Sequence, residues 1–140
     1  MPSALRTEFP WVQIGELADY YERGKPIESE FLKSWDLIER FYDSLEFPFV
    51  PKVRGLIAQM RGRGYDKSLR AGQSLWSLIL SRSRRHGLRD DQPRIAFWFR
   101  NDGMDVYTRI DGEKKVTYPE IAFTTDVDAL LKQLQARDID

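Results

Sequence analysis

Between residues 94 and 118 the sequence alternates strand-forming runs with glycine-containing turns. Residues 94–100 and 104–110 are rich in aromatic and β-branched side chains; Asn101-Asp102-Gly103 separates the two runs, and Asp111-Gly112 follows the second. Runs joined by Asn/Asp-Gly turns are typical of antiparallel hairpins. In the second run, even-numbered side chains would point to one face and odd-numbered ones to the other, so that one face can be buried. The sequence therefore predicts an antiparallel meander.

The predicted sheet is small, and a helix follows it. Pro119 cannot donate a ladder hydrogen bond, so it ends the third strand, 115–118, or restricts it to an edge. Residues 120–123 form a candidate fourth segment, which gives three to four strands. Thr125 is the predicted N-cap of the final helix, with Asp126 and Asp128 in the first turn, where carboxylates suit the helix dipole. Its apolar positions repeat at helical spacing: Val127, Leu130, Leu131 and Leu134.

The part of the chain before residue 93 has mainly helical patterns. A first helix is predicted for 12–23, a second on the apolar stripe Phe31, Trp35, Ile38, Tyr42 and Leu45, and a third for 52–61, which Gly62-Arg63-Gly64 ends. The segment from Leu69 to about His86 is apolar on nearly all sides around residues 75–80, so periodicity does not separate a buried helix from a buried strand. Its length favours a helix.

These elements predict one α+β domain, in which N-terminal helices pack on a small antiparallel meander and a C-terminal helix follows. Its parts are 12–86 (mainly helical), 93–124 (sheet) and 125–137 (helix). A chain of 140 residues is long enough for one core. It contains no cysteine, no apolar run long enough to span a membrane and no apolar signal segment. We therefore expect a soluble, cytoplasmic protein with no membrane association.

Charge is unevenly distributed although the net charge is zero. Residues 1–51 hold 5 Lys/Arg against 10 Asp/Glu, residues 52–89 hold 10 against 1, and residues 90–140 hold 7 against 11. The basic middle could pair with the acidic flanks inside the fold, with another protein or copy, or with a polyanion. The first arrangement is the simplest expectation.

Two sets of charged residues are candidates for binding. An acidic ridge would run along one face of the second helix: Asp36, Glu39, Asp43 and Glu46. The second set comprises the cations that could bind a partner or an anion: Arg54, Arg61, Arg63, Arg82, Arg84, Arg85 and His86. Several of these lie in the segment 81–87, which would be a helix end if Gly87 adopts the left-handed C′ position. Its arginines would then split between helix faces and pair with the acidic ridge or with Asp90-Asp91.

Motifs for catalysis are weak. With one histidine and no cysteine, only an all-carboxylate metal site would be available, and we expect no metal and no cofactor. Asp105, Glu113 and Lys115 resemble in outline the Asp then Glu-x-Lys arrangement of metal-dependent nucleases of the restriction-endonuclease type. That resemblance implies that two carboxylates hold a divalent cation near the scissile phosphate and that the lysine steadies charge. A solubilising charged turn is the favoured interpretation of these residues.

The sequence favours a protein that is not an enzyme. We expect an accessory or regulatory protein that acts through a protein–protein interface with segregated charge, its partner being another protein or a second copy of the chain. Two alternatives remain open. One is nucleic-acid binding through the arginine-rich segment 52–89, and the other is a divalent-metal-dependent nuclease.

Overall fold

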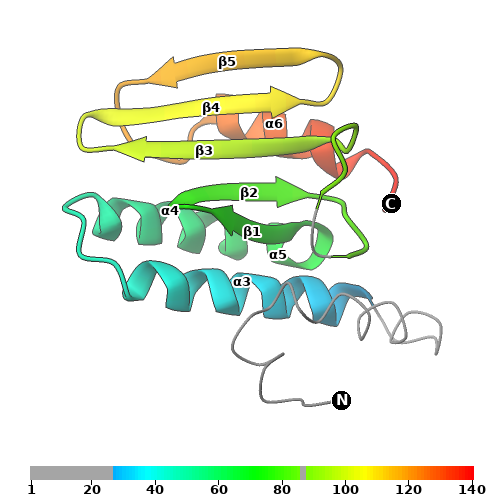
Figure 1. The fold of residues 1–140 in the computed structure, drawn as a ribbon, viewed down its shortest axis with the longest axis horizontal. Coiled ribbons are helices and arrows are strands. Elements are labelled where there is room, and N and C mark those ends of the chain that lie inside the picture. Colours follow the sequence, from blue (N-terminus) through cyan, green and yellow to red (C-terminus); the bar gives the residue numbers. More distant parts are fainter. Residues whose placement is uncertain (1–26, 86–87) are drawn as a thin grey trace.

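The structure, a computed structural model, describes residues 27–85 and 88–140. Its centre is a five-stranded antiparallel sheet whose strands follow one another in chain order, β1-β2-β3-β4-β5 (Figure 1). The strands are β1 (Arg70–Ser74), β2 (Ser77–Ser81), β3 (Arg94–Arg100), β4 (Gly103–Arg109) and β5 (Glu113–Tyr118). Helix α3 (Ile27–Asp43) runs beside β1, and the fold also contains α4 (Val50–Gly62), the short α5 (Tyr65–Ser68) and α6 (Thr125–Gln135). The predicted α+β class is confirmed, with five strands instead of three to four.

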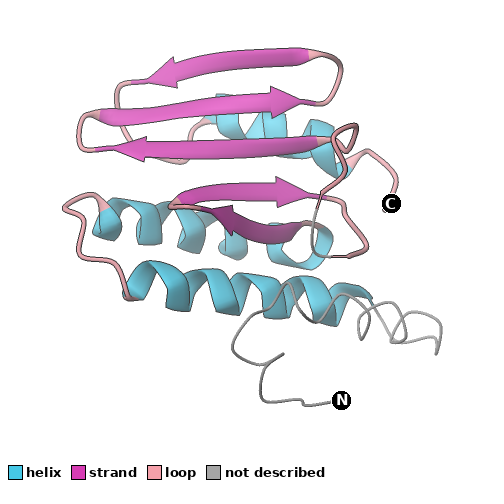
Figure 2. Cartoon of the chain, viewed as in Figure 1, coloured by secondary structure: helices cyan, strands magenta, loops and turns pink. Residues whose placement is uncertain are grey.

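One face of the sheet carries the core. Along β3, Ile95, Phe97 and Phe99 are buried while the residues between them are partly exposed, and β4 alternates in the same way. These side chains share one apolar cluster with residues of α3, α4 and α6. Figure 2 shows these helices in cyan beside the magenta sheet. Because alternate strand residues point to opposite faces, the other side chains of β3 and β4 lie on a second face of the sheet. Within residues 27–85 and 88–140 most of them are at least partly exposed, and we call this the open face.

Helix α3 closes the β1 edge of the sheet. The buried Trp35 donates its indole N–H to the carbonyl oxygen of Leu69, 2.8 Å away, and the hydroxyl of Ser34 accepts the backbone N–H of Ala71 at 2.9 Å. A side chain therefore satisfies a strand donor that would otherwise lack a partner. At the opposite edge, β5 pairs only with β4 among the described residues, and its side chains from 113 to 117 are exposed.

The predicted helix over 69–86 is wrong. The chain forms β1 and β2 there, joined by a two-residue turn at Leu75-Trp76. Apolar residues follow this turn because Leu78 and Leu80 on one side of β2 are buried in the core. Leu75 and Trp76 lie at the tip, and neither is a glycine. Residues 82–85, expected to be a helix end, follow β2 without helical structure. The segment predicted as a first helix, 12–23, lies outside the described residues.

Smaller boundaries also differ from the prediction. Helix α4 begins at Val50, because Pro51 fits the first turn of a helix, where its missing N–H costs nothing. The N-cap of α6 is Thr124 and not Thr125: the Thr124 side chain accepts the backbone N–H of Val127 at 3.2 Å. Residues 120–123 form no strand.

The turn before β4 depends on Gly103. This residue has a φ of 149°, and a Cβ added there would lie 2.2 Å from the carbonyl oxygen of Tyr118. Any other residue would push β5 away from β4 at this point. The predicted Asn-Asp-Gly turn thus has a steric reason as well as a conformational one.

None of the helices in the described part of the chain combines the length and the apolar character needed to cross a membrane.

Candidate interaction surfaces

The acidic ridge of α3 faces an arginine of α4. Arg61 contacts the carboxylates of Asp36, at 3.0 Å, and of Glu39, and its Nε lies 3.0 Å from the buried Asp66. Burial opposes the charge of the guanidinium, but the hydrogen bonds with Asp66 and Asp36 and the charge of Glu39 outweigh it, so the pKa of Arg61 is raised. Three carboxylates from two helices are thus joined by one side chain.

The rest of the ridge is more exposed. Asp43 pairs with Arg54 at 3.0 Å, and both side chains are more than half exposed. Glu46 lies beyond the end of α3 on the surface. Arg63 stacks its guanidinium over the ring of Phe123, 4.8 Å from the ring centroid. Asp36 and Glu39 of the ridge therefore pair with Arg61, and Asp43 pairs with Arg54.

Arginines in and near the segment 81–85 bind backbone carbonyl groups. Arg82 donates to the carbonyl oxygens of Ser68, at 2.6 Å, and Arg137, at 2.8 Å. Burial lowers the pKa of Arg82, and the nearby charge of Asp138 opposes that shift. These bonds tie β2 to the end of α5 and to the chain after α6.

Arg70 is the second arginine with this role. It is buried against the ring of Phe31 and donates to the carbonyl oxygens of Ser83 and Arg84, 2.9 and 2.8 Å away. Arg84 and Arg85 are exposed. His86 lies outside the described residues.

The three residues of the nuclease hypothesis are not brought together as one site. Asp105 accepts a hydrogen bond from Thr117 at 2.9 Å and pairs with Arg100 at 2.7 Å, and that arginine chiefly holds the pKa of Asp105 below its usual value. Glu113 on β5 lies opposite Arg109, and Arg109 is four residues after Asp105 along β4. At about 3.3 Å per residue the two carboxylate-bearing positions are roughly 13 Å apart. Within residues 27–85 and 88–140, no group of three or more potential ligands could hold a metal ion.

Sequence reasoning missed an apolar patch on the surface. The β1–β2 turn and the segment between α3 and α4 meet where the ring of Trp76 packs 5.5 Å from that of Phe47, which in turn stacks on Phe49 at 5.2 Å. Leu75 is 65 % exposed, Trp76 40 % and Phe47 38 %. We call Phe47, Leu75 and Trp76 the apolar patch. Its signal in the sequence is Ser74 and Ser77 on either side of Leu75-Trp76, a polar pair that marks the hairpin tip.

The backbone of the apolar patch is held in an unusual conformation. Leu75 has a φ of 54°, in the left-handed region that favours glycine. The buried Tyr42 donates its hydroxyl to the carbonyl oxygen of Trp76 at 2.7 Å, and burial raises the pKa of Tyr42 above its usual range. The turn is therefore anchored from inside the core while its side chains project outward.

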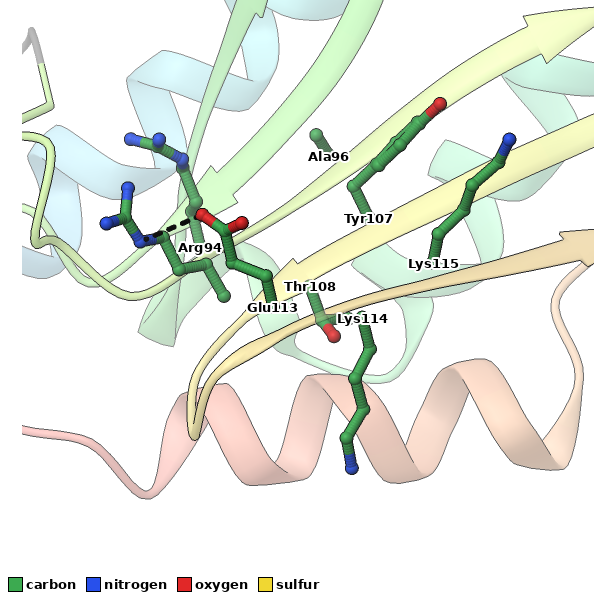
Figure 3. A pocket seen from close by; sticks show the side chains of 8 residues that line it. Arg94, Ala96, Tyr107, Thr108, Glu113, Lys114 and Lys115 are labelled. Carbon is green, nitrogen blue, oxygen red and sulfur yellow. Dashed lines mark ion pairs between the residues drawn. The ribbon is translucent and has the colours of Figure 1, made fainter.

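A second surface was also missed. On the open face of the sheet a hollow of about 370 Å³ lies between the ends of β3, β4 and β5. Tyr107, Lys115, Arg94 and Glu113 stand on one side of the sheet, whereas Lys114 points to the opposite side (Figure 3). The sequence predicted the alternation of β4 but not that strands on both sides would bring further cations to this face.

Searches of protein-family models, curated proteins and solved structures gave no match to this chain.

Proposed function

We propose that this protein is a non-catalytic accessory or regulatory protein that binds a protein partner through the apolar patch. The observation that supports this most strongly is Leu75: a large apolar side chain, 65 % exposed, on a backbone with positive φ. A left-handed conformation at a residue other than glycine costs on the order of 1 kcal/mol, and such strain concentrates at functional sites. A turn selected for stability alone would favour glycine or asparagine at this position.

The construction of the patch fits an interface anchor. The ring of Trp76 rests against Phe47, and its backbone carbonyl is bonded to Tyr42, so the side chain and the backbone of Trp76 are both held before a partner arrives. Ordering side chains on binding costs about 0.5–1.5 kcal/mol each, and a preformed anchor avoids part of that cost. Tryptophan is among the residues enriched at interface hot spots.

The partner surface should be an apolar pocket that receives Leu75 and Trp76. Glu46, exposed and adjacent in sequence to Phe47, would favour a basic residue on the rim of that pocket. The charge segregation of the sequence supports the proposal less than the patch does, because Arg61 and Arg54 already pair with the acidic ridge. A cytoplasmic location belongs to the same proposal and is supported by the lack of cysteine.

A crosslinking experiment tests the proposal. The photoreactive residue p-benzoylphenylalanine replaces Leu75 in one sample and Gln133, exposed on α6, in another, and both are irradiated in lysate of the source cells. We expect one adduct of defined mass from position 75 and none from 133. The captured partner is then purified, and its affinity for Leu75→Asp is compared with that for Val116→Asp. Val116 is 43 % exposed on β5, so it provides the same change on another surface.

The expected result is an affinity loss of at least about tenfold for Leu75→Asp, as for a hot spot, and less than twofold for Val116→Asp. Equal losses for the two variants, or none for Leu75→Asp, would contradict the proposal. Sedimentation of the purified protein at high concentration separates self-association from binding of another protein. A dimer that dissociates in Leu75→Asp would identify the partner as a second copy.

A further inference from the structure

The open face of the sheet places two arginines directly opposite each other. The register pairs Arg94 on β3 with Arg109 on β4, and Glu113 on β5 completes that cross-strand row. Like charges in facing positions destabilise a strand pair. Glu113 lies 3.6 Å from Arg109, whereas Arg94 donates to the carbonyl oxygen of Arg89 at 3.3 Å. The row thus holds two guanidinium groups and one carboxylate, which pairs with Arg109, and it can accept an anion.

The next row supplies an aromatic ring beside these cations. Ala96, Tyr107 and Lys115 are aligned across β3, β4 and β5, and Tyr107 stands between the other two in the hollow (Figure 3). The ammonium group of Lys115 lies 5.6 Å from the centroid of the Tyr107 ring. Ala96 has only a methyl group, which leaves room above the sheet next to the ring. Tyr107 is 39 % exposed, so a flat ligand can reach it.

A second aromatic side chain extends the platform. Trp98 alternates with the buried Phe97 and Phe99, so it belongs to the open face, and it is diagonal to Tyr107 across β3 and β4. Diagonal neighbours on antiparallel strands are about 7–8 Å apart. The face therefore presents two rings in succession, with Arg94 and Arg109 at one end. At the other end Asp105, opposite Trp98, is paired with Arg100.

We propose that this open face binds single-stranded nucleic acid. One base stacks on Tyr107 above Ala96, the neighbouring base stacks on Trp98, and Arg94, Arg109 and Lys115 bind the phosphates. Four cationic residues line the hollow, Arg94, Arg109, Lys114 and Lys115, against one carboxylate, Glu113. Exposed aromatic rings on a sheet, flanked by cations, suit unpaired bases, because each base has a free π-face in a single strand and not in a duplex.

This site differs from the one that the sequence suggested for a nucleic acid. In the segment 52–89, Arg61, Arg70 and Arg82 bind carboxylates and carbonyl groups of the protein itself. The open face uses residues of β3, β4 and β5 instead. It is also separate from the apolar patch, so either proposal can fail without the other.

Fluorescence anisotropy with labelled twelve-nucleotide oligo-dT and oligo-rU tests the inference, with a DNA hairpin duplex and free AMP as competitors. We expect binding to both single strands at low salt, weak competition by the duplex, and weaker competition by AMP than by an unlabelled strand. With three phosphate contacts, log affinity should fall with log salt at a slope of about −2.

Two variants and one control locate the site. Tyr107→Leu removes the ring and should weaken binding about tenfold, as for the loss of one stacked base. Arg94→Gln combined with Arg109→Gln should weaken binding and flatten the salt slope to roughly −0.7. Lys52→Gln removes an exposed charge on α4, away from the sheet face, and should leave the affinity within twofold.

Several outcomes would overturn the inference. These are absence of binding at low salt, unchanged affinity in Tyr107→Leu, an equal loss in Lys52→Gln, or preference for the duplex. AMP that competes as well as a full strand would assign the hollow to a free nucleotide and would also overturn it. Circular dichroism and thermal unfolding of Tyr107→Leu establish that a loss of affinity is not a loss of fold.

Discussion

Side chains at the two ends of the β1–β2 hairpin lie in opposite kinds of environment. At the end formed by Arg70 and Ser81, arginines that are conspicuous in the sequence bind the protein's own carbonyl groups. At the turn, Leu75 and Trp76 are left on the surface although the sequence places them in a core-like run. Arginine is thus a poor marker of a binding surface in this chain, because buried carbonyls and carboxylates compete for it. An apolar turn with positive φ is the more informative feature.

The largest effect should come from Arg61, which contacts three carboxylates of the protein. Arg61→Met keeps the stem but leaves the buried Asp66 without its guanidinium partner, so the free energy of unfolding should fall by about 2 kcal/mol. Urea denaturation measures this decrease in the free energy of unfolding. The matched control is Arg54→Met, whose pair with Asp43 is exposed and should change stability by less than about 0.5 kcal/mol. Equal losses of stability in Arg61→Met and Arg54→Met would contradict the expectation that the more buried ion pair contributes more.

A smaller effect should depend on pH. Tyr65 donates its hydroxyl to Asp128, and this hydrogen bond is the main cause of the lowered pKa of Asp128. A carboxyl group with a lowered pKa stabilises the fold above its unfolded pKa, and that contribution is lost as the pH falls through the folded pKa. Tyr65→Phe should therefore be less stable than the original protein at pH 7, and the gap should narrow below about pH 4.

The stability of Tyr65→Phe at alkaline pH provides a second test. Burial, and then Asp128, raise the pKa of Tyr65 from 10.0 to about 12. A raised pKa stabilises the fold below the unfolded pKa, and that stabilisation is lost as the pH rises through the folded value. The original protein should lose stability above pH 10, whereas Tyr65→Phe should lose less. Thermal unfolding across pH 3–11 records both limbs, and a gap independent of pH would contradict the assignment.

The smallest change in stability is expected at the apolar patch, where a substitution should raise the free energy of unfolding instead of lowering it. Leu75→Gly relieves the positive φ and should raise the free energy of unfolding by about 0.5 kcal/mol, while it weakens partner binding. Leu75→Ala removes the same side chain but keeps the strained backbone, so it should weaken binding with no gain in stability. Thermal unfolding and the partner affinity are measured for both variants. A loss of stability in Leu75→Gly would show that the turn prefers leucine for its own packing.

The sequence predicted best where turn chemistry is explicit. Gly103 and Gly112 both have positive φ, and the Asn-Asp-Gly and Asp-Gly signals marked those turns correctly. The β1–β2 hairpin was missed because Leu75 occupies a position where glycine is usual, so an apolar run hid the turn. Local pattern does not report strain that the rest of the fold imposes.

The surfaces were harder to predict than the elements. Asp36, Glu39 and Asp43 of the acidic ridge lie on α3, whereas Glu46 lies beyond its end. The pairing with Arg61 depends on how α3 packs on α4, which the spacing within one helix does not contain. The open face required the register of three strands to align Arg94 with Arg109, and Ala96 with Tyr107. Such rows are properties of strand pairing and cannot be derived from any single run.

The edge at β5, to which no other described strand pairs, has a consequence for the behaviour of the protein at high concentration. A strand edge with free backbone groups can recruit the edge of another molecule and seed aggregation. Here Lys114 and Lys115 are exposed along the strand, and Pro119 follows its last residue. Charge and proline are two of the means by which natural sheets discourage such growth. The lysines next to the proposed nucleic-acid site thus serve colloidal stability as well as recognition.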